Sequence, residues 1–491
     1  MTRSRTRCSN TRCARRSAGI ALVGVLLALA LASAAPARQP VGWRMDGTGN
    51  FPQAQPPLEW SPTQHVLWST PMPQWSNASP IVVGDRIFVS SEPDTLICVR
   101  ASDGRILWQR TNALEDAVPT KISHHSEVEQ ESRLQQARQA LAQAEYDLTS
   151  LRRQLRSSPK DADASSKARA LRKQAGELRR ELAALAKAAK PPSVHEANGY
   201  STPTPTSNGE SVQVLFGTGV VASYDLDGNR RWIKWLDRVQ VPNGAAASPV
   251  LAGGKLLVLL NDLIALDAAS GEVEWRVNVP SRPGTPALFQ IEGQDLVILP
   301  SGHCVRVADG AVVASGLGDL EYNSPLVRDG VLYMIQGTAQ AFRIPRKMAD
   351  SLTFEPLWTS KLKGERYYSS PLLLDGLIYA VTRTQIFNVV DAKTGAIVYA
   401  ERLRLGETAG VDSVYSSITQ GGGHVFVSGF EGATAVLAPG RTFQQRALNR
   451  LAAFRSNPVF DGDRIYVRGN DRLYCLSANA AGDTTSSARS P

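Results

Sequence analysis

Cysteine and histidine are scarce in this chain of 491 residues, which holds five Cys and six His. No two Cys are adjacent and no C-x-x-C-H run occurs, so a covalent haem site is excluded. His124 and His125 are neighbours that would not face each other on a helix. No nucleophile elbow with a Ser/His/Asp set is visible. The sequence therefore predicts no metal site and no catalytic residue.

Acidic residues are absent from residues 1–37, which hold six Arg. Small apolar residues and Leu run from Ala18 to Ala35, and Ala32-Ser33-Ala34 or Ala35-Pro36-Ala37 offers a small-x-small cleavage site. This pattern predicts a secretory signal peptide, and no Cys follows it as a lipid attachment site. The alternative is an uncleaved membrane anchor, for which the apolar stretch is short.

The strong positive charge that marks a nucleic-acid-binding surface is also missing from the rest of the chain. The formal net charge is +9, and subtracting the six Arg of residues 1–37 leaves only +3. The sequence therefore predicts no nucleic-acid partner.

A short β-rich repeat occupies most of the chain, and its clearest copy runs from Ser248 to Trp275. Ser248-Pro249 opens the copy, and three apolar runs follow, separated by turns at Gly253-Gly254 and Ser270-Gly271. Pro is tolerated at the first residue of a strand, and Gly supplies the turn conformations of hairpins. One such small sheet cannot bury both of its faces, so it must stack on copies of itself.

Eight copies are present when the chain is aligned on the strand-opening residue. These residues are Pro80, Pro205, Pro249, Pro286, Pro325, Pro371, Ser417 and Pro458. From Pro249 onward the copies are 37 to 46 residues apart, and a four-stranded propeller blade needs about 40–50 residues. The second half of the unit recurs as CVRASDGRILW (Cys98 to Trp108) and VVDAKTGAIVY (Val389 to Tyr399).

This combination of SP-apolar-G-apolar with ALDxxxGxxxW resembles the pyrroloquinoline-quinone (PQQ) type of β-propeller repeat. The resemblance covers about residues 43–477 and is closest in character to proteins like the outer-membrane assembly factor B. It implies an all-β, eight-bladed propeller. Because one fold hosts many functions, it does not by itself assign an activity.

The last repeat, Asn457 to Ser477, lacks a closing strand with Trp, whereas Gln64 to Trp68 (QHVLW) precedes the first full repeat. We therefore predict that this N-terminal strand completes the last blade and closes the ring. For the Trp residues at strand ends, we favour packing between blades over a ligand platform. They are Trp68, Trp108, Trp232 and Trp275.

An insertion between the first two blades has helical rather than β periodicity. Leu and Ala recur with alternating spacings of three and four residues, first from Leu134 to Leu155 and then from Ala168 to Ala189. Two such stretches joined by a turn-rich link predict an antiparallel helical hairpin of coiled-coil type over residues 126–190. We expect this arm to project from the propeller, where it could dock a protein partner or be a self-contained decoration.

Three Cys remain after the predicted leader, and they stand at equivalent positions of different repeats. They are Cys98, Cys304 and Cys475, and the third repeat has Ala265 at the same place. Equivalent positions on different blades are too far apart for a disulfide. We therefore predict small buried residues and no disulfide.

The resemblance implies a possible cofactor site, because quinoprotein dehydrogenases hold PQQ with calcium or a lanthanide in the axial channel, next to an Asp base and usually a vicinal disulfide. None of these features can be assigned to residues of this chain. We therefore predict no cofactor, and PQQ with calcium enters only under the dehydrogenase alternative.

Tyr, Asn and Arg gather just before the strand-opening residues, where they would meet at one end of the channel. The candidate ligand-binding residues are Asn77, Tyr200, Tyr322, Asn323, Tyr367, Tyr368, Tyr415 and Arg455, and Asn243 stands at a similar place. Such residues suit a sugar or peptide ligand, although we favour ordinary hydrogen bonding between blades as their role.

The predicted domains are the signal peptide (1–37), a closing strand with blade 1 (41–123), the hairpin insertion (124–192), blades 2–8 (193–478) and a disordered tail (479–491). The first functional hypothesis is an exported, soluble, non-catalytic scaffold for protein partners in the periplasm or cell envelope. The alternatives are a PQQ-dependent quinoprotein dehydrogenase and a carbohydrate- or peptide-binding propeller.

Overall fold

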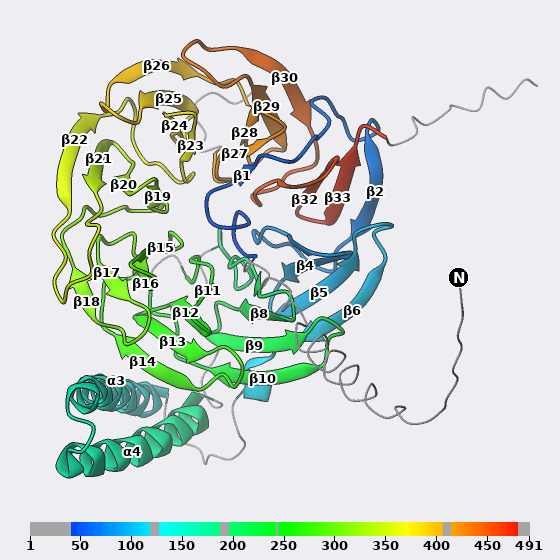
Figure 1. Ribbon diagram of the computed structural model, residues 1–491. Coiled ribbons are helices and arrows are strands. Elements are labelled where there is room, and N and C mark those ends of the chain that lie inside the picture. Colours follow the sequence, from blue (N-terminus) through cyan, green and yellow to red (C-terminus); the bar gives the residue numbers. More distant parts are fainter. Residues whose placement is uncertain (1–40, 118–126, 187–195, 242–243, 406–413, 480–491) are drawn as a thin grey trace, which may run out of the picture. The chain divides into compact units, whose positions relative to one another are not determined.

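The computed structural model describes residues 41–117, 127–186, 196–241, 244–405 and 414–479. The predicted signal peptide (1–37) and, apart from Asn479, the predicted C-terminal tail (479–491) lie outside these residues. Within them, strands form eight small sheets, and Figure 1 shows these sheets arranged as the blades of a ring. The predicted eight-bladed propeller is therefore confirmed. No described helix is long and apolar enough to span a membrane.

Each of the first four blades is a meander of four antiparallel strands in chain order, with the first strand at the centre of the ring (Figure 1). Blade 1 contains β3 (Ile81–Val83), β4 (Arg86–Ser91), β5 (Thr95–Arg100) and β6 (Ile106–Thr111). Blade 2 contains β7 (Thr206–Ser207), β8 (Ser211–Leu215), β9 (Val220–Asp225) and β10 (Arg230–Trp235). Blade 3 contains β11 (Val250–Ala252), β12 (Lys255–Leu259), β13 (Leu263–Asp267) and β14 (Val273–Val277). Blade 4 contains β15 (Ala287–Ile291), β16 (Gln294–Ile298), β17 (Cys304–Arg306) and β18 (Val312–Ala314).

The next three blades repeat this order, and the last blade receives its outer strand from the N-terminal part of the chain. Blade 5 contains β19 (Leu326–Arg328), β20 (Val331–Met334), β21 (Thr338–Arg343) and β22 (Glu355–Lys361). Blade 6 contains β23 (Leu372–Leu374), β24 (Leu377–Val381), β25 (Ile386–Asp391) and β26 (Ile397–Arg402). Blade 7 contains β27 (Thr419–Gly421), β28 (His424–Ser428), β29 (Ala433–Leu437) and β30 (Gln445–Arg450). Blade 8 contains β31 (Val459–Asp461), β32 (Arg464–Arg468), β33 (Arg472–Ser477) and β2 (Val66–Pro71).

The ring is closed by the N-terminal strand, as predicted. β2 pairs antiparallel with β33, and Trp68 stands opposite Cys475. A second N-terminal strand that the sequence pattern did not reveal, β1 (Asn50–Phe51), pairs in parallel with β27 at the inner edge of blade 7. The two ends of the chain are thus joined within one sheet, which removes an open strand edge.

At five junctions between neighbouring blades, a tryptophan of one blade packs on a glycine turn of the next. The Trp232 ring covers Gly271, where an added Cβ would lie 2.6 Å from a ring carbon, and its Nε1 donates a hydrogen bond to Ala268 O at 3.1 Å. The same pair of contacts recurs at Trp68, Trp108, Trp275 and Trp358. The packing role predicted for Trp68, Trp108, Trp232 and Trp275 is confirmed.

The three cysteines of the propeller are free and fully buried, at equivalent positions of their blades. Cys98 stands opposite Trp108 and Cys475 opposite Trp68, in the ladder between the third and fourth strands. Ala265 stands opposite Trp275 in the same way. This slot therefore holds a small side chain, which lies beside a packed tryptophan in blades 1, 3 and 8 and opposite Ala314 in blade 4.

The insertion forms two long helices, α3 (Glu127–Ser157) and α4 (Ala162–Ala186), preceded by the short helix α2 (Leu114–Ala117). Asp161 caps α4, since its carboxylate accepts a hydrogen bond from the Ala164 N–H at 2.9 Å. Side chains of the predicted seam are buried between α3 and α4. They are Leu134, Ala137, Leu141, Ala144, Leu148, Ala168, Ala175 and Leu182.

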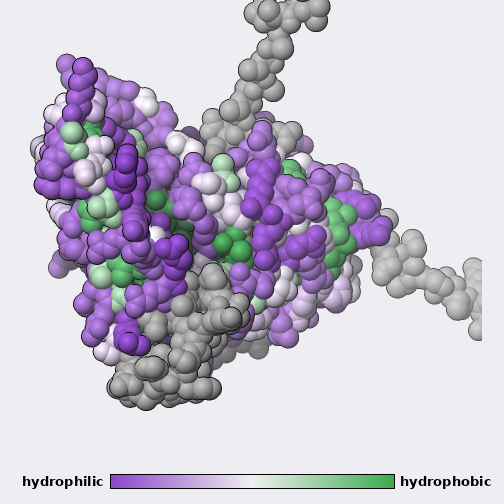
Figure 2. Space-filling model, turned by 90° about the horizontal axis from the view of Figure 1, so that it is seen from below, coloured by the Kyte–Doolittle hydropathy of each residue, from purple (hydrophilic) through white to green (hydrophobic). Residues whose placement is uncertain are grey.

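The expectation that this hairpin projects from the propeller is wrong. Helix α3 packs against β14, the outer strand of blade 3, and Figure 1 shows the hairpin beside the outer edge of the ring. Arg138 of α3 pairs with Asp237 after blade 2, and Arg156 pairs with Asp309 in blade 4. A buried ion pair at Arg138 and a more exposed one at Arg156 therefore hold α3 along the rim. The face viewed in Figure 2 is mostly hydrophilic, with scattered apolar side chains.

Candidate ligand-binding cavity

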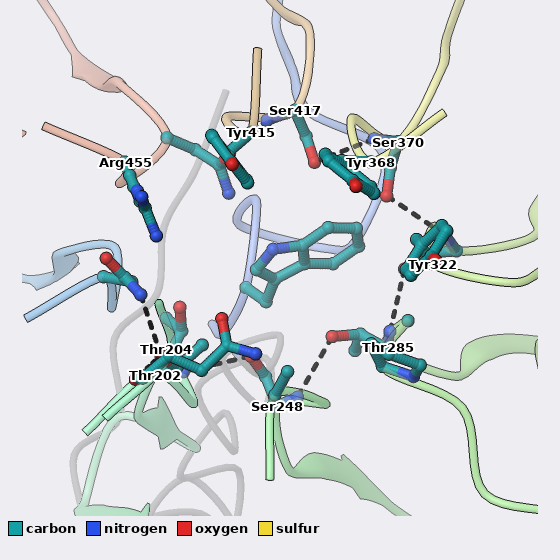
Figure 3. A pocket seen from close by; sticks show the side chains of 18 of the residues that line it. Thr202, Thr204, Ser248, Thr285, Tyr322, Tyr368, Ser370, Tyr415, Ser417 and Arg455 are labelled. Atoms are coloured by element: carbon teal, nitrogen blue, oxygen red, sulfur yellow. Dashed lines mark hydrogen bonds between the residues drawn. The ribbon is translucent and has the colours of Figure 1, made fainter. Parts of the chain in front are cut away.

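A closed ring of eight hydrogen bonds links the blades at the point where each inner strand begins. In each bond, a main-chain N–H donates to the side-chain oxygen of the corresponding residue in the next blade, at 2.6–3.1 Å. In ring order these residues are Ser79, Thr204, Ser248, Thr285, Ser324, Ser370, Ser417 and Asn457. Figure 3 shows part of this ring.

The ring corrects the alignment of the seventh repeat by one residue. Ser417 occupies the position of the residue before Pro, because its N–H donates to Asn457 and its hydroxyl accepts from Ser370. Ile418 therefore stands where the other repeats have Pro. Unlike Pro it has an N–H, which donates to Ser370 O at 3.2 Å.

A cavity of about 490 Å³ lies inside this ring. It brings together five of the predicted ligand-binding residues, which come from five different blades or inter-blade segments: Asn77, Tyr322, Tyr368, Tyr415 and Arg455. Tyr322, Tyr368, Tyr415 and Arg455 surround the cavity in Figure 3. Ligand binding by these residues stays a prediction.

The other three predicted residues do not line this cavity. Tyr367 is buried, and its hydroxyl donates to Lys363 O at 2.7 Å. Burial also raises the pKa of the Tyr367 phenol above its ordinary value. Asn323 is buried and donates to Ile335 O at 2.9 Å, while the Tyr200 N–H donates to the Glu92 carboxylate at 2.8 Å. Asn243 lies outside the described residues.

Aromatic rings form a continuous wall on one side of the cavity. Tyr322 meets Tyr368 edge to face, with ring centroids 4.7 Å apart, and Tyr368 stacks on Tyr415 at 5.2 Å. The Arg455 guanidinium lies 4.3 Å from the centroid of the Tyr415 ring and donates a hydrogen bond to Ala197 O at 2.7 Å. These contacts fix the orientation of Arg455 at the cavity wall.

Two further lining residues, Trp43 and Arg366, were not predicted from the sequence. Trp43 precedes the first repeat, so no periodic pattern places it at the centre of the ring. Its neighbour Arg44 is buried and donates to Pro371 O at 3.0 Å and to Ile418 O at 2.5 Å. Burial of Arg44 lowers the pKa of its guanidinium to about 9. Arg44 thus anchors the N-terminal segment to blades 6 and 7.

The cavity lining contains two Arg but no Asp, Glu or His among the residues that the structure describes. Calcium in proteins is held mainly by carboxylate and carbonyl oxygens, and the quinoprotein mechanism needs a carboxylate base. These residues therefore fit neither a calcium ion nor that base. In the described part of the chain, moreover, no three His, Cys, Asp or Glu side chains gather as metal ligands would.

A family profile described as outer membrane protein assembly factor BamB matches residues 59–234, 162–346 and 327–488. The crystal structure of BamB from Moraxella catarrhalis is 14% identical, covers 84% of this chain and 97% of its own, and superposes with a TM-score of 0.51. No curated protein matches the sequence.

Quinoprotein enzymes share the fold to a similar degree. A europium-containing methanol dehydrogenase is 10% identical over 89% of this chain and 98% of its own, with a TM-score of 0.53. A quinohemoprotein alcohol dehydrogenase from Pseudomonas putida HK5 is 11% identical over 90% of this chain and 80% of its own, with a TM-score of 0.50. At such identities these similarities concern the fold alone.

Proposed function

Since the chain belongs to the family of the outer membrane protein assembly factor BamB, we propose that it is a non-catalytic scaffold that binds protein partners in the cell envelope. The observation that carries this proposal is the hairpin α3–α4, which is fastened to the propeller rim by buried ion pairs. The predicted export signal supports the envelope location.

The attachment of the hairpin centres on Glu145 of α3. Its carboxylate pairs with Arg179 of α4 and with Arg276 of β14, each at 2.7 Å. Arg276 also pairs with Asp262 at 3.0 Å and lies 3.6 Å from Asp237. Burying charged groups costs free energy unless geometry and pairing are very good. The hairpin therefore has one well-defined orientation on the propeller.

The outward face of the hairpin is available to a partner. Arg169, Lys173 and Arg180 of α4 are exposed and share one helix face, because they are four and seven residues apart. A rigid element that presents charged side chains in a fixed geometry is suited to docking. The propeller closes through β2 and β33 without it, so ring closure does not explain why the insertion is present.

Site-specific photocrosslinking in cells tests this proposal. A photoreactive amino acid is placed at Arg169 or Lys173, and the matched control is Arg446, which is exposed on the outer strand of the opposite blade 7. We expect one discrete protein adduct from both hairpin positions and none from Arg446. The absence of any adduct from the hairpin, or the same adducts from Arg446, would contradict the proposal.

A quinoprotein dehydrogenase is the second candidate, and the shared propeller fold is what favours it. The composition of the cavity weighs against it, because Arg, Tyr, Ser and Thr replace the carboxylates that calcium and the base would require.

A further inference from the structure

One face of helix α4 carries a row of exposed cations. Arg172, Lys173 and Arg180 follow Arg169 by three, four and eleven residues, so these four side chains lie along the same side of the helix. We call this row the basic face. At a rise of ~1.5 Å per residue it is about 17 Å long. Figure 1 shows α4 farther from the ring than α3, so the basic face belongs to the outer helix of the hairpin.

The positive charge of the basic face is not neutralised by the hairpin itself. In the described part of the chain, none of its four cations forms an ion pair with a carboxylate. The carboxylates close to them have other partners, since Glu145 pairs with Arg179 and Asp163 pairs with Lys167. The four cations are therefore free to bind carboxylates of another molecule.

Positive charges are also crowded where the basic face approaches α3. Arg152 of α3 is half-buried, and burial together with the charge of Arg172 lowers the pKa of the Arg152 guanidinium. Arg179 and Arg156 act in the same direction, and Glu274 opposes them. Because like charges repel, an external anion on this side of the hairpin would relieve the repulsion.

Gly176 leaves the helix backbone open in the middle of the basic face. It stands four residues after Arg172 and four before Arg180, and an added Cβ would meet no atom within 4 Å. Gly destabilises the interior of a helix relative to Ala, and the packing of the hairpin does not require it here. The backbone of a partner can therefore come close to α4 between the two arginines.

The shape of the basic face favours a narrow partner over a membrane surface. Asp163, Glu177 and Glu181 lie on the flank of α4 beside the basic face, where a broad anionic surface would meet them too. Among the described side chains of α4, no large apolar one is exposed as a membrane anchor. A chain segment lying along the helix avoids these carboxylates, and Arg guanidinium groups bind carboxylates through paired hydrogen bonds.

We infer that the basic face binds a protein segment that carries a row of Asp or Glu side chains, spaced as on one face of a helix. This inference rests on the proposed function, because it names the chemistry of the partner that the hairpin would dock. Exposed ion pairs add little affinity, but they speed association and select the partner. The contact should therefore be transient and should weaken as the salt concentration rises.

Photocrosslinking in cells from Ser165 tests the inference. Ser165 is exposed on the basic face, four residues before Arg169, and a photoreactive residue there leaves all four cations in place. We expect one protein adduct, crosslinked within a segment rich in Asp and Glu. The variant Arg172→Glu/Arg180→Glu should lower the adduct yield roughly tenfold, because two attractions become repulsions. The matched control Arg133→Glu makes the same kind of charge change on α3 and should leave the yield unchanged.

A charge exchange gives the sharpest form of this test. Replacing the acidic residues of the crosslinked segment with Lys should restore the adduct in the Arg172→Glu/Arg180→Glu variant. Both arginines are exposed and without ion pairs in the described part of the chain, so this variant should fold, and circular dichroism checks that it does.

The outcomes separate this inference from the proposed function. An adduct from Ser165 whose yield is the same in the double variant would leave the hairpin a docking element but overturn the acidic partner. The absence of any adduct would overturn both. The purified full chain should not sediment with phosphatidylglycerol vesicles at physiological salt. Sedimentation that is lost in the double variant would overturn the inference in favour of a membrane surface.

Discussion

The Arg276 guanidinium on the outer strand of blade 3 lies 2.7 Å from the Glu145 carboxylate of helix α3, and their side chains are only 7% and 3% exposed. Burial lowers the pKa of Arg276, but the carboxylates of Glu145, Asp237 and Asp262 outweigh it and raise that pKa above its ordinary value. Two parts of the chain that are 131 residues apart are thus joined by a buried charge pair.

Replacing one partner of this pair should destabilise the protein strongly. Arg276→Met leaves Glu145 buried without its closest rim cation, and breaking a buried pair costs about 3–5 kcal/mol. Urea unfolding of Arg276→Met, Glu145→Met and the double variant measures the coupling. The exposed pair Arg343–Glu355 is the control, for which Arg343→Met should cost less than about 1 kcal/mol. If Arg276→Met and Arg343→Met lowered the free energy of unfolding equally, a buried attachment of the hairpin would be contradicted.

The packing of Trp232 on Gly271 leaves no room for a side chain at that glycine. Gly271→Ala adds a Cβ that would lie 2.6 Å from the Trp232 ring, at a positive φ of 71°. Gly254 has a similar φ of 75° but no neighbouring atom within 4 Å of an added Cβ. Gly254→Ala should therefore cost only the backbone strain, about 1–2 kcal/mol, and Gly271→Ala distinctly more. Thermal unfolding of both variants measures the difference. Equal losses of stability would show that packing against Trp232 is not the reason why Gly271 is required.

Each hydrogen bond of the Ser and Thr ring should stabilise the contact between the two blades that it links. Ser248→Ala removes the acceptor of the buried Thr204 N–H, which costs about 1–3 kcal/mol when no other acceptor replaces it. Ser248→Thr keeps the oxygen and should be nearly neutral, because Thr285 occupies this position in the next blade. A denaturation series that finds the Ala and Thr variants equally stable would show that this ring bond does not stabilise the fold.

The buried thiols should make the fold sensitive to alkali. Burial raises the pKa of Cys98, Cys304 and Cys475 to about 12, from an ordinary value of 9.0. Above pH 9 the unfolded chain releases these protons and the folded chain keeps them, so stability falls as pH rises from about 9 towards 12.

The matched variant replaces all three residues with Ala, the residue that blade 3 already has as Ala265. Between pH 8 and pH 10 the wild-type chain should lose more stability than this variant. In the wild-type chain without residues 1–37, which removes Cys8 and Cys13, the three remaining thiols should react with a thiol reagent only after unfolding. Identical pH dependence of the two chains, or rapid reaction in the native state, would contradict the burial of these thiols.

The repeat architecture could be predicted from sequence because its signals are local. A strand-opening Pro and a turn Gly recur at nearly constant distance, and each has one physical reason to be there. The single misplaced repeat was the one in which Ile418 replaces Pro, which left only Ser417 to mark the strand. The buried seam of the hairpin could also be predicted, because Leu and Ala follow the helical period in both α3 and α4.

The attachment of the hairpin and the centre of the cavity could not be predicted, because both depend on distant contacts. Nothing near Glu145 or Arg276 indicates that they meet, and Trp43 lies in a segment without periodicity. Four of the candidate residues form two pairs of sequence neighbours, and in an extended chain the side chains of neighbouring residues point to opposite sides. Tyr322 and Tyr368 therefore line the cavity while the adjacent Asn323 and Tyr367 are buried in the wall.

We propose that this propeller serves binding and not redox catalysis. Calorimetric titration of the full chain with PQQ, with and without calcium, followed by an assay for reduction of an artificial electron acceptor by alcohols or aldoses, tests it most directly. We expect that calcium leaves the titration unchanged and that no substrate reduces the acceptor. Tight, stoichiometric binding that requires calcium, with substrate-dependent reduction, would contradict the account and make the chain a dehydrogenase.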